Sequence, residues 1–354
     1  MLNYRDGLAD MPLYDTREQD WNIKVNANES NVGLPPLVED RVMTRLSRIA
    51  FPRYPNEEYD LLCEQIGEGY GYRRENVIIG NGSSEIIEKV FHAFGGNQEH
   101  RIVYPSPSFS MYAIYAAAAD ATGVPVPLRP DYQLDVEAFI QQVNQSQASL
   151  AVICNPNNPT GQILTSEEVE YIASHISCAF LVDEAYAEFC EHSVMSLLKK
   201  YPHMMVARTF SKAYALASCR VGYMLAHENV INMLTKTYMP YHMNVPSLVI
   251  ADTVFQMRTE FKPQIQMICA ERERMQERYQ ALADLTVYPS HANFLLIHYA
   301  QAEALNEDLI RYGIGVRSFG KAPGLENMLR ISIGRADQND EVYRIIKAFV
   351  EGHS

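Results

Sequence analysis

The chain has 354 residues, of which 47% are hydrophobic and 21% are charged, and its formal net charge is −13. This length predicts one large domain with a smaller one, and the composition is that of a soluble globular protein. The acidic balance argues against a nucleic-acid partner, because binding a phosphate backbone requires a basic surface. No apolar run approaches the ~20 residues that a membrane-spanning helix needs.

The cysteines and the N-terminus predict a cytoplasmic protein. The six cysteines form no CxxC pair and no framework spacing, which favours a reducing compartment and indicates no metal site. The first fifteen residues, MLNYRDGLADMPLYD, contain acidic residues and no long apolar core, unlike a signal peptide.

Residues 1–45 are expected to form an irregular N-terminal arm, because prolines at 12, 35 and 36 interrupt any long element. The arm includes the polar stretch VNANESNVG, which ends at Gly33 and is typical of a loop. The segment RYPN follows at 53–56, and an amphipathic helix is predicted from Tyr59 through Ile66.

A strand, a glycine-containing turn and a helix are predicted from residue 77 to residue 94. The apolar strand VII runs into GNGSS, and the helix that follows carries its apolar residues on one face. Glycines allow close backbone approach, and a helix N-terminus offers unpaired N–H groups to an anion. This loop lacks the GK[ST] of a Walker A motif, and Glu85 replaces the third glycine of GxGxxG. It therefore predicts a single-phosphate site, although a plain strand-to-helix turn remains the alternative.

Further apolar strands are predicted at 101–104, 124–128, 150–154, 179–182 and 204–207. Several of them run directly into polar segments: PSPSF, NPNNPTG, DEAY and TFSK. Open α/β sheets bind their ligands beyond the carboxyl ends of the strands. The pattern therefore predicts a doubly wound, mostly parallel sheet with a ligand site at this edge. Thr165 and Glu168 also form a capping-box pattern for the next helix.

Lys212 follows the strand at 204–207, at the point where the pattern is expected to turn helical. A lysine whose pKa is lowered by burial and by cationic neighbours can attack a carbonyl and form a Schiff base. Arg220, eight residues later, could lower that pKa and also pair with a phosphate. A solvated lysine at a helix start is the structural alternative.

Four residues beside these strands suit an aromatic, electron-accepting ring. An anion at a strand end, such as Asp183, can keep a pyridinium nitrogen protonated. The structural alternative is that Asp183 caps a helix or forms an ion pair, as most such aspartates do. Tyr186 and Asn158 can donate to a phenolate oxygen, although NPTG is also a good turn. Phe109 can stack on a ring, although an isolated aromatic more often lies in the core. With the phosphate loop and Lys212, these are the groups that pyridoxal phosphate requires.

After Pro246 a long charged helix at 262–285 precedes a smaller α+β region. Arg317 and Arg330 lie on separate predicted elements of this region, and either could bind an anionic substrate group, although surface arginines are more common. We expect a large domain at about 46–245 and a small domain at 246–354.

The sequence resembles the fold-type I aminotransferases and, among them, the histidinol-phosphate aminotransferase branch. The likeness extends from NANES to RISIG with the motifs in family order. Its most specific parts are NPNNPTG, VDEAYAEF, the TFSKAYALA segment with its arginine, and VRSF followed thirteen residues later by LRISIG. It implies pyridoxal 5'-phosphate bound to Lys212, with Asp183 against the pyridine nitrogen. It further implies cofactor contacts from Asn158, Tyr186, Phe109, Gly82, Ser83, Ser211 and Arg220.

The resemblance also implies a homodimer with shared active sites, in which Tyr54 reaches the cofactor of the neighbouring subunit. Arg330 and Arg317 would bind the anionic end of the substrate, and Asn28 and Glu29 would belong to a loop closing over it. The loop sequence NESNVG departs from the usual NENPxG, RYPN departs from RYPD, and Ser218 and Cys219 replace the customary small pair before the phosphate arginine. The first departure bears on substrate identity.

The implied reaction is transamination between histidinol phosphate and a 2-oxo acid such as 2-oxoglutarate. Three alternatives remain at this point: an aromatic amino-acid aminotransferase, a lyase similar to threonine-phosphate decarboxylase, and a sensor or scaffold that kept the fold. The retention of Lys212, Asp183, Asn158 and Arg220 argues against the last of these.

Overall fold

The structure, a computed structural model, describes residues 19–190 and 192–352. Residues 1–18 of the predicted N-terminal arm lie outside this range. The helices are α1 (Pro36–Leu46), α2 (Glu58–Tyr70), α3 (Gly82–Phe94), α4 (Met111–Ala118), α5 (Val136–Gln145), α6 (Ser166–His175), α7 (Glu228–Thr235), α8 (Val245–Gln256), α9 (Lys262–Gln280), α10 (Ala302–Arg311) and α11 (Ala336–Gly352). The strands are β1 (Ile23–Lys24), β2 (Val77–Asn81), β3 (Arg101–Ser106), β4 (Thr122–Pro127), β5 (Leu150–Cys154), β6 (Ala179–Asp183), β7 (Met204–Thr209), β8 (Val221–Ala226), β9 (Leu285–Tyr288), β10 (Phe294–Tyr299), β11 (Ile314–Gly315), β12 (Arg317–Ser318) and β13 (Met328–Ser332).

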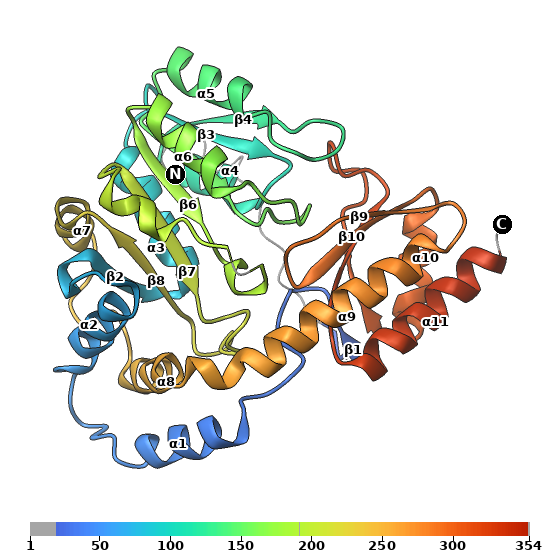
Figure 1. Cartoon of the computed structure of the whole chain (residues 1–354), viewed down its shortest axis with the longest axis horizontal. Helices are drawn as coiled ribbons and strands as arrows, with labels where there is room; N and C mark the ends of the chain where they lie inside the picture. The colour runs from blue at the N-terminus through green and yellow to red at the C-terminus, as the bar shows by residue number, and fades with distance from the viewer. Residues whose placement is uncertain (1–18, 191, 353–354) are drawn as a thin grey trace, which may run out of the picture.

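The larger lobe is built on a seven-stranded sheet in the order β2-β8-β7-β6-β5-β3-β4 (Figure 1). Strand β8 is antiparallel to both of its neighbours, and the other pairings are parallel. The carboxyl ends of β2, β3, β5, β6 and β7 therefore meet at one edge, and β8 begins there. This arrangement confirms the predicted doubly wound, mostly parallel sheet.

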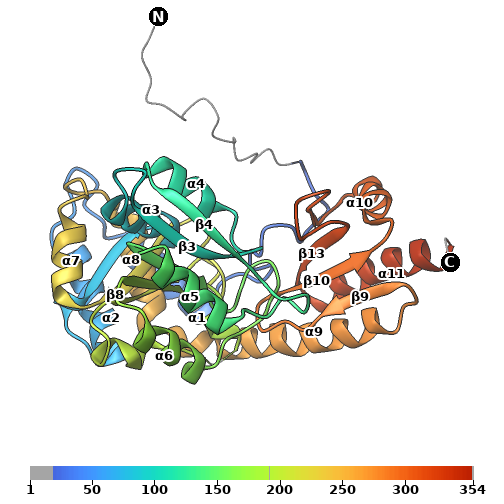
Figure 2. The same ribbon diagram turned by 90° about the horizontal axis from the view of Figure 1, so that it is seen from above.

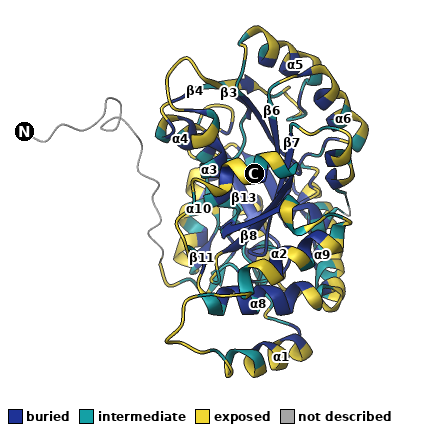
Figure 3. Ribbon diagram, turned by 90° about the vertical axis from the view of Figure 1, so that its left-hand side faces the viewer, coloured by how far each residue is buried: buried dark blue, intermediate teal, exposed yellow. Residues whose placement is uncertain are grey.

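Helices cover both faces of this sheet, and for that reason its central strands are buried and mostly apolar. Helices α3, α4 and α7 contribute to the core on one face, and α2, α5, α6 and α8 contribute to the core on the other. Every residue of β5, β7 and β8 is buried. Figure 3 shows the buried strands enclosed by helices whose outer surfaces are exposed. The sheet thus forms a rigid support for the loops at its carboxyl edge.

The smaller lobe has an antiparallel sheet in the order β12-β13-β10-β9, packed against α9, α10 and α11. Helix α9 runs from the larger lobe to the smaller one (Figure 2). The N-terminal segment joins this lobe, because β1 pairs in parallel with β11. The sequence predicts an α+β region in the C-terminal part of the chain, and the structure confirms it.

Three local features differ from the sequence-based expectations. Residues 36–46 form helix α1 rather than irregular chain, because Pro36 occupies the first turn, where its missing N–H costs no hydrogen bond. Lys212 lies in a series of bends and turns between β7 and β8 and does not begin a helix. Helix α8, which the predicted boundary at 246 assigns to the small domain, packs against α1 and α2. The predicted capping box of Thr165 and Glu168 is present at the start of α6.

Candidate active site

A cavity of about 640 Å³ lies at the carboxyl edge of the large sheet and reaches the smaller lobe. Its walls come from the segments that follow β3, β5, β6 and β7, from the start of α3, and from β12 and β13. Eleven of the residues predicted to form a site line this cavity: Asn28, Ser83, Phe109, Asn158, Asp183, Tyr186, Ser211, Lys212, Arg220, Arg317 and Arg330. Residues up to 300 positions apart in the sequence are thereby brought together.

Lys212 carries the amine of the cavity. Its Nζ donates a hydrogen bond to the carbonyl oxygen of Ala27 at 2.9 Å. The pKa of Lys212 is lowered to about 8, mainly by burial and also by the positive charges of Arg330 and Arg220, which together outweigh the opposing effect of Glu29 and Asp183. A substantial fraction of this amine is therefore neutral near physiological pH, as a nucleophile or base requires.

Asp183 ends strand β6 with its carboxylate buried at the floor of the cavity. The hydroxyl of Tyr112 donates to its Oδ2 at 3.0 Å, and the backbone N–H of Ala185 donates to its Oδ1 at 3.2 Å. The pKa of Asp183 is raised to about 6, because the effect of burial outweighs the opposing effect of these two donors. The carboxylate is thus held in place and is available to a cationic group entering the cavity.

The start of α3 and Arg220 form a compact anion site. Gly82 has φ +80°, and a Cβ on it would lie 2.5 Å from a guanidinium nitrogen of Arg220. The same guanidinium donates to the Ser211 hydroxyl at 3.3 Å. Gly222 on β8 permits the close approach of α3, since a Cβ there would lie 2.1 Å from the backbone nitrogen of Ser83. The lining residue Ser83 therefore presents a helix N-terminus beside a guanidinium, an arrangement suited to one phosphate group.

Substitution of Gly82 by alanine is expected to weaken binding of the phosphorylated cofactor by about 10-fold or more. The new Cβ would displace the Arg220 guanidinium, and the positive φ would add roughly 1–2 kcal/mol of backbone strain. Titration of the cofactor against the purified variant measures this change. Gly96→Ala is a matched control, because Gly96 also has a positive φ but its added Cβ would contact nothing within 4 Å. Equal cofactor affinity in the two variants would contradict the assignment.

Arg330 connects the two lobes across the cavity. From β13, its guanidinium donates to Oδ1 of Asn158 at 2.6 Å and to the carbonyl oxygen of Asn26 at 2.7 Å. Arg317 on β12 is its direct cross-strand neighbour. Because one arginine nitrogen fixes the Asn158 oxygen, the orientation of the Asn158 amide group depends on Arg330. The cavity thus carries cationic groups on both lobes.

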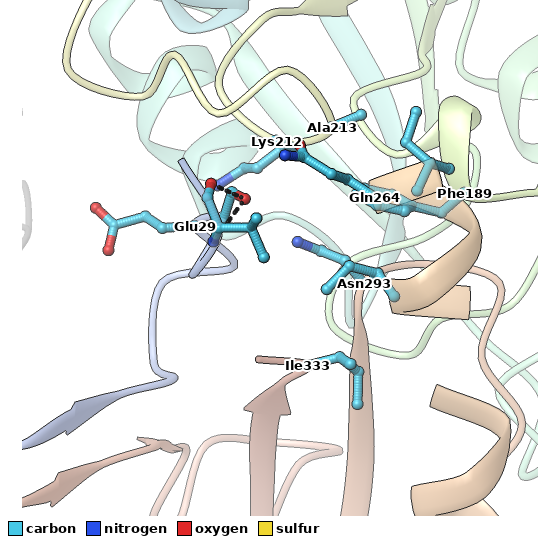
Figure 4. Close-up of a pocket in the computed structure, with 11 residues that line it drawn as sticks. Glu29, Phe189, Lys212, Ala213, Gln264, Asn293 and Ile333 are labelled. Carbon is cyan, nitrogen blue, oxygen red and sulfur yellow. Dashed lines mark hydrogen bonds between the residues drawn. The ribbon is translucent and has the colours of Figure 1, made fainter. Parts of the chain in front are cut away.

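The remaining predicted residues lie at the margin of the cavity or away from it. The ring of Phe109 packs edge-on against Tyr112, with centroids 5.5 Å apart. Glu29 forms an ion pair with Lys24 at 2.7 Å, and its carboxylate points away from the small pocket that it helps to line beside Lys212 (Figure 4). Tyr54 is 77% exposed and stacks on Tyr241 with ring centroids 4.7 Å apart. Neither Glu29 nor Tyr54 lines the main cavity within this chain.

Several residues that shape the cavity are not assigned to a site by the sequence. Tyr112 contacts the Asp183 carboxylate from α4, and only its spacing of three from Phe109 hinted that it shares a helix face with that ring. Cys154 lines the cavity beside Asp183 because the two residues are paired in register on β5 and β6. Phe319, the last residue of the VRSF motif, and Leu325 add an apolar wall from the loop before β13, a role that the sequence assigns to neither residue.

Comparisons with known proteins show which family has this sequence pattern and this fold. The family model for class I and II aminotransferases matches residues 22–346. The histidinol-phosphate aminotransferase of Thermoanaerobacter pseudethanolicus is 34% identical over 343 residues, which are 97% of each protein. That of Pyrococcus furiosus is 34% identical over 338 residues, which are 96% of this chain and 95% of the relative. The crystal structure of histidinol-phosphate aminotransferase from Sinorhizobium meliloti with pyridoxal-5'-phosphate superposes with a TM-score of 0.87 at 23% identity, over 95% of this chain and 93% of that chain.

Proposed function

We propose that this chain, which belongs to the class I and II aminotransferase family, transfers the amino group of L-histidinol phosphate to 2-oxoglutarate in histidine biosynthesis. The observation that carries the substrate assignment is full-length similarity, above 30% identity, to several proteins named histidinol-phosphate aminotransferase. The substrate assignment is also supported by a second cationic group in the cavity, which Arg330 and Arg317 form on the smaller lobe. A phosphorylated substrate and a phosphorylated cofactor need separate anion sites.

The cofactor is pyridoxal 5'-phosphate, and the donor set of the cavity fits it. The start of α3, Ser211 and Arg220 would hold the phosphate in the cradle that Gly82 and Gly222 leave open. Asp183 would face the pyridine nitrogen, and Asn158 and Tyr186 would donate to the phenolic oxygen of the ring. Phe109 would contact the ring face. When bound, the cofactor supplies an aldehyde that condenses with amines and a ring that accepts electrons from the substrate.

Each polar residue then has a separate task in the reaction. Lys212, with its lowered pKa, provides an amine that can attack a carbonyl, can remove the proton from the Cα of the amino donor and can deliver a proton to the Cα of the acceptor. Asp183 supplies a fixed negative charge, and Tyr112 keeps it in position. Arg330 binds the anionic end of the substrate, and Phe319 and Leu325 exclude water from the substrate ring.

A homodimer would complete this site. Seven large apolar side chains on α1, on α2 and in the connections at 47–57 and 236–244 are at least 45% exposed: Leu37, Met43, Phe51, Tyr54, Leu61, Met239 and Tyr241. They belong to α1, α2 and the connections beside them, and the Tyr54–Tyr241 stack joins the two connections. Contiguous exposed apolar surface marks protein interfaces. A second copy of this chain would cover the surface and receive Tyr54 at its cofactor phosphate.

Mixing two inactive variants tests the shared site. One set of chains carries Lys212→Ala and the other carries Tyr54→Ala. In a mixed dimer, one of the two sites combines the intact Lys212 of one chain with the intact Tyr54 of the other. Random reassortment is expected to restore about one quarter of the wild-type activity per site, because about half of the dimers are mixed and half of their sites are intact. Absence of any recovery, despite mixed dimers detected by native mass spectrometry, would exclude the sharing of Tyr54.

A panel of amino donors tests the substrate assignment. Each donor is added alone to the enzyme with its cofactor, and conversion of the cofactor to its amine form is followed by absorbance. We expect conversion with histidinol phosphate at a kcat/KM at least about 100-fold above that with phenylalanine or tyrosine, because a phosphate ester offers three acceptor oxygens to Arg330 and Arg317 together, whereas a carboxylate offers two. A preference for the aromatic amino acids would indicate the other transaminase, and release of carbon dioxide from threonine phosphate would indicate the lyase.

A further inference from the structure

The N-terminal segment at residues 25–31, here called the strap, runs between the two lobes and contacts three side chains of the proposed site. The carbonyl oxygen of Asn26 accepts from Arg330, and that of Ala27 accepts from Lys212. The next residue, Asn28, contacts Tyr186. Figure 4 shows the strap beside Lys212, with Asn293 of the smaller lobe directed toward the same region. The strap therefore contacts groups from both lobes.

Asn28 is the most constrained residue of the strap. It is 1% exposed and has φ 55°, a conformation that asparagine tolerates better than most residues. Its backbone N–H donates to Ser332 Oγ at 2.9 Å, and its Oδ1 accepts from the same hydroxyl at 3.0 Å. Its carbonyl oxygen accepts from Asn293 at 3.1 Å, and its Nδ2 donates to the Tyr186 hydroxyl at 3.0 Å. Hydrogen bonds within the protein thus engage each polar atom of Asn28.

This pattern has a consequence for the Tyr186 hydroxyl. A phenolic oxygen has one proton to donate and accepts through its lone pairs. Because Asn28 donates to that oxygen, the hydroxyl proton is directed elsewhere, and Tyr186 lines the main cavity. We propose that Asn28 is a positioning residue that acts through Tyr186, orienting its hydroxyl to donate into the cavity, rather than a residue that contacts the substrate. The inference rests on the proposed function, in which the acceptor is the phenolic oxygen of the cofactor.

Other groups around Tyr186 do not duplicate this effect. Arg330 on β13, Cys154 on β5 and Asp183 on β6 interact with it electrostatically, and Asn28 supplies the hydrogen bond from the strap. Burial raises the pKa of Tyr186, so that the phenol keeps its proton at neutral pH. The oxygen of this neutral phenol already accepts a hydrogen bond, and its own proton remains to be donated to another group.

The variant Asn28→Asp tests the inference with little change of shape. Aspartate also tolerates a positive φ and keeps the oxygen that accepts from Ser332, but it replaces the Nδ2 donor with an acceptor. The Tyr186 proton would then turn toward residue 28. We expect kcat/KM to fall by about 10- to 100-fold, a range typical of residues that orient a contacting group. We also expect the pH midpoint of the absorbance change of the bound cofactor to rise by about one unit, because its phenolic oxygen loses a donor.

The double variant with Tyr186→Phe distinguishes positioning from general damage to the fold. If Asn28 acts through Tyr186, adding Asn28→Asp to Tyr186→Phe changes kcat/KM and the pH midpoint by no more than about twofold and ~0.2 unit. Asn97→Asp is the matched control, since it makes the same chemical change at an exposed residue outside the cavity and keeps the oxygen that accepts from the backbone of Glu99, and it is expected to retain wild-type values. Asn28→Gly, which keeps the backbone conformation and removes the donor, replaces Asn28→Asp if the latter does not fold.

Additive losses in the double variant, or a wild-type pH midpoint in Asn28→Asp, would overturn the inference while leaving the proposed function intact. The absorbance is read without substrate, so this result does not depend on which amine is the donor. A wild-type chain that shows no cofactor absorbance would instead remove the proposed function, and the inference with it.

Discussion

Replacement of Lys212 by alanine is expected to lower kcat by roughly 10⁵-fold or more, the scale seen when a covalent catalytic nucleophile is removed. The lysine has no substitute in the described cavity, where the other cationic side chains, Arg220, Arg317 and Arg330, are guanidinium groups. Guanidinium stays protonated in proteins and cannot serve as an amine nucleophile or base. The loss should therefore be almost complete.

The environment of Lys212 explains why this amine is effective. With a pKa of about 8, roughly one tenth of it is neutral at pH 7. At its ordinary pKa, fewer than ~1 in 1,000 molecules would be neutral. Lys212→Arg tests the amine separately from its charge, because arginine keeps the positive charge beside Asp183 but has no usable amine. Steady-state assays of both variants should give similarly small rates, and substantial turnover in either one would contradict the assignment of Lys212.

Substitution of Asp183 by asparagine is expected to lower kcat by about 10³-fold, comparable to the removal of a group that stabilises charge in the transition state. Both carboxylate oxygens accept hydrogen bonds, one from Tyr112 and one from Ala185. An amide has only one acceptor oxygen, so the asparagine side chain would leave one of these donors facing an NH₂ group. It would also lack the negative charge that a pyridinium nitrogen requires. Steady-state assays of Asp183→Asn and of Asp183→Glu, which keeps the negative charge, measure this loss of kcat.

The stability of the Asp183 variant should change in the opposite direction from its activity. The folded-state pKa of Asp183, about 6, lies above the ordinary value of 3.8, so folding disfavours the ionised form. This side chain therefore lowers the free energy of unfolding at high pH, by about 3 kcal/mol for a shift of roughly two units. The cofactor-free Asp183→Asn protein should be at least as stable as the wild type at pH 8. The difference should disappear as the pH falls through about 6 toward 4. A large loss of stability at pH 8 would indicate a structural role instead.

The sequence predicts those parts of the site that depend on local pattern. Asp183 and Asn158 follow apolar strands, and the carboxyl ends of parallel strands meet at one edge, so their convergence follows from the strand pattern alone. The glycine-serine turn before α3 likewise predicts a helix N-terminus at that edge. Lys212 was placed correctly after β7, although the helix expected there is a series of turns.

Contacts between distant segments could not be predicted in this way. Arg330 bonds to Asn158 across 172 positions, and neither residue's local sequence indicates its partner. Asn28 lies in a polar stretch that predicts only a loop, and its bonds to Tyr186 and Ser332 depend on how β1 joins the smaller lobe. Tyr112 has the spacing of a core residue, and its hydroxyl reaches Asp183 only because of how α4 packs against α3 and β4. Tertiary packing, rather than periodicity, determines these positions.

Reduction of the enzyme–cofactor complex with borohydride, followed by peptide mass spectrometry, tests the central claim most directly. The account predicts a phosphopyridoxyl group attached to the peptide that contains Lys212, with fragment ions that place it on that side chain. Attachment to another lysine, or a reduced protein without the added mass, would contradict it.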